Sequence, residues 1–214
     1  MANDTTATGS QRVAVIGPGK VGSQLVRGFA RAGHHVTVGA RDVVKAGDLT
    51  ALARVEVLDP GAAAAAADVV VLAVPVRALA ETLEALGDLS GKVLVDATNA
   101  VSDVCVRAVE GYETVSDYIA ERAPGAAVVK AFNTIGSEHL ADGTIGDHAV
   151  FLPVAGDDRG RAAVVALAES LGFDVADLGG RDAVSIVENA ARLWIHLAFR
   201  CGWGREFGFG VLRP

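Results

Sequence analysis

The stretch Arg12–Gly22, RVAVIGPGKVG, constrains the fold of this chain more than any other. Its first five residues are mostly apolar and β-branched, as in a strand that is buried on both faces of a parallel sheet. Gly17, Gly19 and Gly22 follow at G-x-G-x-x-G spacing. After them, apolar residues recur at helical spacing. The sequence therefore predicts a strand, a tight glycine turn and a helix.

Such a turn is typical of dinucleotide-binding sites. The first glycine permits the turn, the second lets the backbone approach a pyrophosphate, and the third lets the helix pack closely on the strand. The helix start adds amide groups and the positive end of its dipole. We expect the pyrophosphate to lie against Gly17, Pro18, Gly19, Lys20, Val21 and Gly22. A purely structural glycine turn is the alternative, and a P-loop is excluded because no Ser or Thr follows Lys20.

The second predicted strand, His35–Gly39, ends without the acidic residue that binds the ribose 2′-hydroxyl of NAD. Ala40 and Arg41 follow it, and a small residue beside a guanidinium suits a 2′-phosphate, because arginine is always charged and binds phosphate oxygens as a fork. Lys45 adds a second positive charge. These residues favour NADP over NAD. The alternatives are a solvated loop cation at Arg41 and a helix N-cap at Asp42.

Strands and helices alternate through the rest of the first half of the chain. Further strands are predicted at Arg54–Leu58, Asp68–Val74 and Lys92–Asp96, and helices at Val43–Ala53, Pro60–Ala67 and Val76–Leu86. The alternation predicts an α/β fold with a Rossmann-type, doubly wound parallel sheet. Ligands bind such sheets beyond the carboxyl ends of the strands. We therefore expect Asn99 to meet the nicotinamide or its ribose, with an ordinary turn residue as the alternative.

The second half of the chain continues the Rossmann pattern to residue 148 and ends in a small C-terminal α/β extension. Its pattern predicts helices at Val115–Arg122 and Arg159–Leu171, and strands at Ala126–Phe132, Val150–Ala155 and Phe173–Leu178. A longer helical pattern follows, in which Trp194 and Phe199 are expected in the core. Four glycines then interleave with Trp203, Phe207 and Phe209, which suits a wall for a flat ring or a dimer seam.

Three parts are expected along the chain. Residues 1–11 are predicted to be a disordered tail, residues 12–148 an NADP-binding Rossmann domain, and residues 149–214 a small acceptor-binding or dimerisation part. The net charge of −7 argues against nucleic acid and anionic membranes as partners. No apolar run reaches the roughly 18 residues of a membrane span. The two cysteines have no metal or redox spacing, so we expect no metal site and a cytoplasmic location.

No hydrolytic signature is visible, and the five histidines are scattered along the chain. Lys130 and Asn133 are the best polar candidates near the cleft, because the strand Ala126–Phe132 ends there, but no residue is identified as catalytic. Carbonyl reduction usually needs a positioned proton donor. Hydride exchange between two ring cofactors mainly needs stacking and placement.

Over residues 12–212 the chain resembles the NADPH-dependent deazaflavin reductases, also called coenzyme F420-dependent NADP oxidoreductases. The motifs that carry the resemblance are the opening glycine turn, VGAR at 38–41, KAFNTIG at 130–136, PVAGDD at 153–158 and the glycine–aromatic C-terminus. The resemblance implies hydride transfer between NADPH and coenzyme F420, with Arg41 on the 2′-phosphate. It also implies a nicotinamide site bordered by Val74, Pro75, Asn99 and Ile135, with the deazaflavin between this site and the C-terminal tail.

Two segments depart from the archaeal members of this family. The sequence DATN at 96–99 stands where they have a loop rich in Val and Pro, and Val76 stands where they have an aromatic residue. Two alternatives therefore remain open: an NADPH-dependent reductase of a flavin or a small imine or carbonyl, and a non-catalytic NADP(H)-sensing module. Turnover with an acceptor separates the enzymes from the sensor. A homodimer is expected.

Overall fold

The computed structural model describes residues 9–99 and 109–213. The predicted disordered tail lies outside this range over residues 1–8. Its last three residues are within the range. The Ser10 hydroxyl donates to the Gly33 carbonyl, and the Gln11 amide donates to His34 Nδ1.

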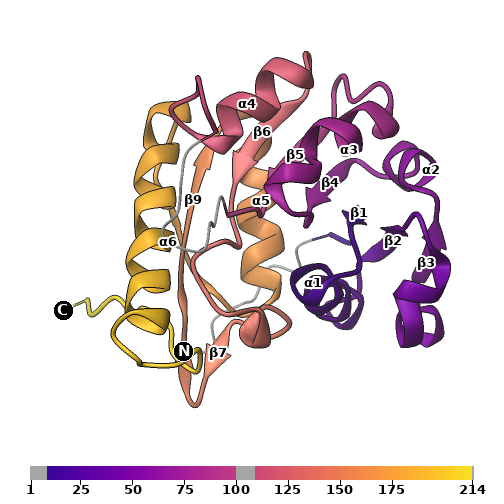
Figure 1. Ribbon diagram of the computed structural model, residues 1–214. Helices are drawn as coiled ribbons and strands as arrows, with labels where there is room; N and C mark the ends of the chain where they lie inside the picture. Colours follow the sequence, from indigo (N-terminus) through magenta and orange to yellow (C-terminus); the bar gives the residue numbers. More distant parts are fainter. Residues whose placement is uncertain (1–8, 100–108, 214) are drawn as a thin grey trace.

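One eight-stranded sheet forms the centre of the protein (Figure 1). Six strands run parallel, in the order β3-β2-β1-β4-β5-β6. They are β1 (Arg12–Ile16), β2 (His35–Gly39), β3 (Val55–Leu58), β4 (Val69–Leu72), β5 (Val93–Asp96) and β6 (Ala127–Lys130). This arrangement confirms the predicted doubly wound α/β fold.

Two more strands extend the sheet beyond β6. There β9 (Phe151–Gly156) pairs antiparallel with β6, and β10 (Asp174–Asp177) pairs parallel with β9. A separate two-stranded hairpin, β7 (Thr144–Ile145) and β8 (His148–Ala149), has no counterpart in the sequence prediction. The strands β9 and β10 thus belong to the same sheet as β1–β6. The division of the chain into two parts at residue 148 stays a prediction.

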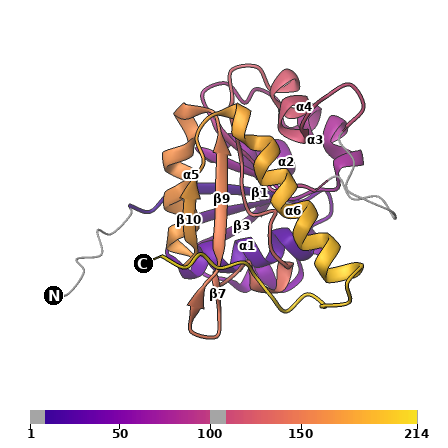
Figure 2. The ribbon, with the colours of Figure 1, turned by 90° about the vertical axis from the view of Figure 1, so that its left-hand side faces the viewer.

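Helices cover both faces of the sheet (Figure 2). One face carries α1 (Lys20–Arg31) and α5 (Asp158–Ser170), and the other carries α2 (Pro60–Ala65), α3 (Leu79–Leu86) and α4 (Val115–Arg122). The last helix, α6 (Val184–Phe199), packs against β9. Short 3-10 segments are η1 (Val43–Ala51), η2 (Val76–Ala78), η3 (Ser137–His139) and η4 (Arg181–Ala183). Within the described residues, no helix combines the length and the apolar character that a membrane span needs.

The predicted helix at Val43–Ala53 is wrong. The segment forms 3-10 turns that break at Gly47, where φ is +51°. This conformation is open to glycine but costly for other residues. Gly47 therefore separates two short 3-10 turns, where the apolar pattern predicted one helix.

The parallel strands are apolar on both faces because each face meets a helix layer. In β1, Val13 and Val15 face the layer of α1, whereas Ala14 and Ile16 face the layer of α2 and α3. All four are buried to 2% exposure or less. The unbroken apolar runs that predicted these strands are thus a direct result of the layered fold.

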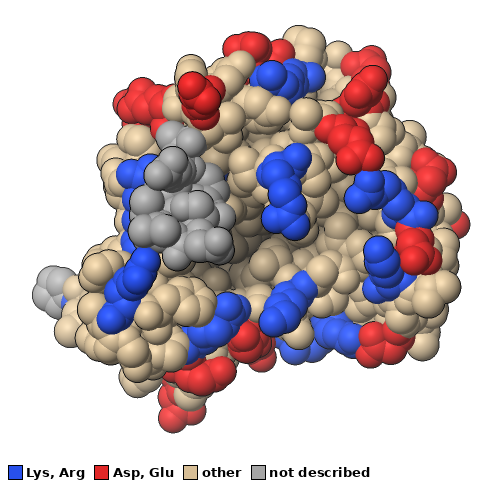
Figure 3. All heavy atoms as spheres, in the orientation of Figure 1, with Lys and Arg blue, Asp and Glu red and all other residues tan. Residues whose placement is uncertain are grey.

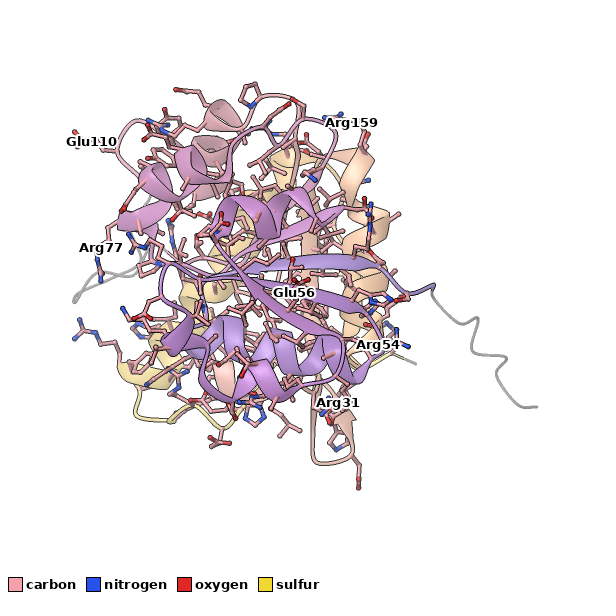
Figure 4. All side chains as sticks on the ribbon, turned by 90° about the vertical axis from the view of Figure 1, so that its right-hand side faces the viewer. Arg31, Arg54, Glu56, Arg77, Glu110 and Arg159 are labelled. Atoms are coloured by element: carbon pink, nitrogen blue, oxygen red, sulfur yellow. The ribbon has the colours of Figure 1, made fainter. Side chains whose placement is uncertain are left out.

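Figure 4 shows the sheet from the side of β3. Arg31 and Arg54 project near the edge at which the parallel strands begin. Arg77, from η2, projects at the opposite edge, where the carboxyl ends of these strands meet. Ligand sites in doubly wound sheets lie along that second edge.

Candidate dinucleotide-binding site

The glycine turn after β1 is as tight as the sequence predicts. Gly17 has a φ of +101°, and a Cβ there would lie 2.8 Å from the Ala73 carbonyl oxygen. A Cβ on Gly22 would lie only 1.9 Å from the Gly17 carbonyl oxygen, so the start of α1 packs directly on the turn. Gly19 has open space around its α-carbon, since a Cβ there would meet no atom within 4 Å. This space leaves the backbone accessible to a ligand.

The N-terminus of α1 is electrostatically ready for an anion. Gly19 is the N-cap residue, no side chain caps the helix, and its first turn holds no acidic residue. The first amide groups of a helix have no intrahelical acceptor, and they carry the positive end of the dipole. The turn and this helix start therefore suit a pyrophosphate.

A cavity of about 180 Å³ opens between the glycine turn, the end of β2 and α3. The predicted site residues that line it are Gly17, Pro18, Ala40, Arg41, Lys45, Val74 and Pro75. The structure adds wall residues from α3 and its start, which the sequence reasoning missed: Ala78, Glu81, Thr82 and Ala85. The space-filling view shows a hollowed centre to one face of the molecule, with Lys and Arg side chains on its rim (Figure 3).

Arg41 does not stand free in this cavity. Its Nη1 atom lies 2.7 Å from Glu81 Oε1, and the two side chains are 73% and 70% exposed. Lys45 lines the same cavity, and no carboxylate among the described residues pairs with it. Asp42 accepts a hydrogen bond from the Val44 amide and caps η1, which confirms the N-cap interpretation of this residue. The end of β2 therefore presents two cations, of which Arg41 is held in an exposed ion pair.

The predicted residues Asn99 and Ile135 lie beyond this cavity, on the loops that follow β5 and β6. Asn99 Nδ2 donates to the Asn133 carbonyl at 2.8 Å, which ties the two loops together. The turn between β6 and Asn133 contains Phe132. Its φ of +60° is uncommon for a residue that carries a side chain. Within the described residues, Asn133 Oδ1 and Thr134 Oγ1 are buried and have no hydrogen-bond partner.

Orphaned buried polar atoms are rare in folded proteins, and each calls for a physical explanation. Here they lie beside the predicted nicotinamide position, on a turn with a strained residue. Both atoms are closed off from solvent in this conformation, so a nicotinamide amide or a ribose hydroxyl would bond to them only after the loop that follows β6 has moved.

Lys130, a candidate for chemistry in the cleft, is fully buried instead. Its Nζ atom donates to Asp96 Oδ2 and to the Thr98 carbonyl, both at 2.9 Å, and lies 3.2 Å from Glu188 Oε1. An ammonium group has three donors and no acceptor. Two of these contacts are hydrogen bonds and the third is an ion pair, so the side chain joins β5, β6 and α6 rather than facing a substrate.

The two carboxylates around Lys130 have further partners. Asp96 also accepts from the Thr98 amide, the Thr98 hydroxyl and the Ser116 hydroxyl, at 2.8–2.9 Å. Glu188 accepts from the Val115 amide, the first residue of α4, at 3.0 Å. We call Asp96, Lys130 and Glu188 the buried ion cluster. It ties α4 and α6 to the carboxyl ends of β5 and β6.

The C-terminal tail folds back onto the loop after β6. Arg205 donates to Glu138 at 2.9 Å and to the Ser137 hydroxyl at 3.0 Å. The guanidinium of Arg205 also lowers the pKa of Glu138. Trp194 is buried in α6, as predicted, and its ring stacks on Phe207 with centroids 5.2 Å apart. Phe199 is 58% exposed, so its predicted place in the core is wrong.

These features define a dinucleotide-binding α/β protein with an anion-binding turn and a cationic cavity at the end of β2. Comparison with known proteins gives the family. A sequence profile described as "NADP oxidoreductase coenzyme F420-dependent" matches residues 12–100. The F420-dependent NADP reductase of Methanothermobacter thermautotrophicus is 36% identical over 210 residues, which cover 88% of this chain and 90% of that protein.

Solved structures agree. A putative F420-dependent NADP reductase from Arthrobacter sp. FB24 superposes with a TM-score of 0.83 at 29% identity, over 95% of this chain and 100% of that one. A reductive aminase from Aspergillus terreus shares only the fold, with a TM-score of 0.69 at 21% identity over 91% of this chain and 63% of that one. The chain belongs to the coenzyme F420-dependent NADP oxidoreductase family.

The buried ion cluster is expected to contribute strongly to the free energy of unfolding. Replacing Lys130 by Met removes the positive charge and leaves two buried carboxylates without it, so we expect the free energy of unfolding to fall by about 3–5 kcal/mol. Lys45→Met, at an exposed position, is the matched control and should change stability by less than about 0.5 kcal/mol. Urea unfolding followed by circular dichroism measures both. A Lys130→Met loss as small as that of the control would contradict the proposed role.

Proposed function

We propose that this protein transfers a hydride between NADPH and coenzyme F420. The family membership and the F420-dependent NADP reductase with 36% identity support this activity. The observation that carries it in this chain is the cavity at the end of β2, which joins an anion-binding glycine turn to Arg41 and Lys45. The nicotinamide ring supplies the hydride, and the protein residues bind, orient and shield the two rings.

The proposed placement of NADPH follows the carboxyl edge of the sheet. The turn from Gly17 to Gly22 holds the pyrophosphate through backbone amides, and Arg41 and Lys45 hold the 2′-phosphate. Ala40 gives the phosphate room beside Arg41. The nicotinamide lies at the loops after β4, β5 and β6, which carry the residues Val74, Pro75, Asn99 and Ile135.

An absorbance assay tests the activity itself. F420 absorbance should fall when NADPH and enzyme are mixed, and it should return when reduced F420 meets NADP. Flavin mononucleotide and a small cyclic imine are the comparison acceptors. Tight NADPH binding without oxidation by any acceptor would point to the sensor, and turnover confined to the flavin or the imine would point to the other reductases.

The 2′-phosphate assignment makes a sharper prediction. Arg41→Ala should weaken NADPH binding by about 1.5–3 kcal/mol, the range for a charge-assisted contact, and should leave NADH binding nearly unchanged. Isothermal titration with each cofactor measures the difference. An equal loss for both cofactors would show that Arg41 does not bind the 2′-phosphate.

We further propose that residues after Cys201 complete the site of the second ring. The tail packs on the loop after β6 through Arg205, Ser137 and Glu138, and this loop also carries Ile135 at the proposed nicotinamide position. A second ring stacked on the nicotinamide would therefore lie close to the tail.

Removal of residues 203–214 should leave NADPH binding within a few-fold of the full chain. Acceptor reduction should fall much further, because donor and acceptor must be held about 3–3.5 Å apart and small misplacements cost orders of magnitude. Because the tail also covers Trp194, the milder Arg205→Gln variant is measured alongside, and unfolding curves establish that both proteins are folded. Full-rate acceptor reduction by the folded truncation would place the acceptor site elsewhere.

We also propose that the protein is a cytoplasmic homodimer. Ile186 and Leu193, seven residues apart on α6, share one helix face and are each more than half exposed, and this face suits a second copy. Cys201 is an exposed free thiol, as suits a reducing compartment. Sedimentation velocity should give a dimer for the native chain and a monomer for Leu193→Asp. A native monomer would contradict the proposal.

A further inference from the structure

The guanidinium proposed to bind the 2′-phosphate already holds an anion of the protein itself. Arg41 follows β2, whereas Glu81 lies in the first turn of α3, and the two meet across the cavity with Nη1 and Oε1 2.7 Å apart. Both side chains line that cavity. The carboxylate thus occupies a position from which a phosphate oxygen would bond to Arg41.

We propose that Glu81 is a built-in competitor for the 2′-phosphate and sets how strongly this chain prefers a phosphorylated cofactor. The proposal rests on the proposed role of Arg41 as the 2′-phosphate ligand. In the absence of cofactor, Glu81 neutralises Arg41 and holds it at the cavity. When a phosphorylated ribose enters, Arg41 exchanges its carboxylate partner for the phosphate.

Glu81, rather than Asp42, is the carboxylate that competes with the phosphate for Arg41. Asp42 also lines the cavity, but its side chain accepts from the Val44 amide and caps η1. Lys45 lines the cavity without a carboxylate partner among the described residues, so it can receive a phosphate without an exchange. Of these two cations, only Arg41 must release a carboxylate, that of Glu81, before it can bind a phosphate.

The exchange is physically accessible because the pair is exposed. A solvent-exposed ion pair contributes little stability, since water screens the charges and two flexible side chains lose freedom. Binding of the phosphate to Arg41 nevertheless breaks the Arg41–Glu81 contact, and the free energy of that contact is lost from the binding free energy. Glu81 therefore lowers affinity for a 2′-phosphorylated ligand moderately, and it has no such effect on a ligand that ends in a ribose hydroxyl.

The test uses two small probes that differ in the phosphate alone, 2′,5′-ADP and 5′-AMP. Their dissociation constants are measured by isothermal titration for the native chain, Glu81→Gln and the matched control Glu84→Gln. Glu84 is exposed on the same helix, and it is not among the residues that line the cavity. We expect Glu81→Gln to bind 2′,5′-ADP three- to tenfold more tightly, whereas Glu84→Gln and all 5′-AMP values change less than twofold.

A second arm checks that Glu81 acts through Arg41. In an Arg41→Ala background, Glu81→Gln should improve 2′,5′-ADP binding less than twofold. Unchanged or weaker 2′,5′-ADP binding by Glu81→Gln in the native background would overturn the proposal. If the native chain binds 2′,5′-ADP no better than 5′-AMP, the 2′-phosphate site itself fails. If Arg41→Ala loses the preference and Glu81→Gln has no effect, the role of Glu81 alone fails.

Discussion

A lysine buried between two carboxylates holds in place the carboxyl ends of β5 and β6, beside which the cofactor site is proposed. Lys130, Asp96 and Glu188 lie at 7% side-chain exposure or less, and burying charges is costly unless each is paired and hydrogen-bonded. That condition is met only when β5, β6 and α6 lie in one arrangement. Asp96 and Lys130 are also the last residues of their strands, so the cluster fixes where the loops toward Asn99 and Ile135 begin.

The two ends of the proposed cofactor site differ in rigidity. The pyrophosphate end is built from backbone, and a Cβ at Gly22 would collide with the turn, so its shape has little freedom. The ribose end is built from exposed side chains, Arg41 and Glu81, whose pairing is weak enough to be exchanged. The structure thus combines a fixed anion cradle with an adjustable selectivity contact.

The sequence predicted the layered sheet and the glycine turn because each has a local signal: apolar runs and fixed glycine spacing. It did not predict Glu81, which lies 40 residues from Arg41 along the chain and looks like any solvent-facing residue of a helix. Lys130 was expected in the cleft because its strand ends there. Its burial depends on Glu188, and nothing in an apolar helical pattern shows that this glutamate points inward. The prediction that Phe199 lies in the core was wrong for a different reason: helical spacing does not show where along a helix the packing against the core ends.

The same contrast separates the two halves of the proposed reaction. The residues proposed to bind the dinucleotide phosphates lie between Gly17 and Lys45, within the segment 12–100 that the family profile matches. The proposed acceptor side consists of the loops after β5 and β6 and of the C-terminal tail. This tail is held by Arg205 and by the Phe151 amide, which donates to the Phe209 carbonyl. Its shape depends on how distant segments pack. The glycine turn is therefore encoded locally, whereas the Arg41–Glu81 contact and the proposed acceptor side both depend on the tertiary structure.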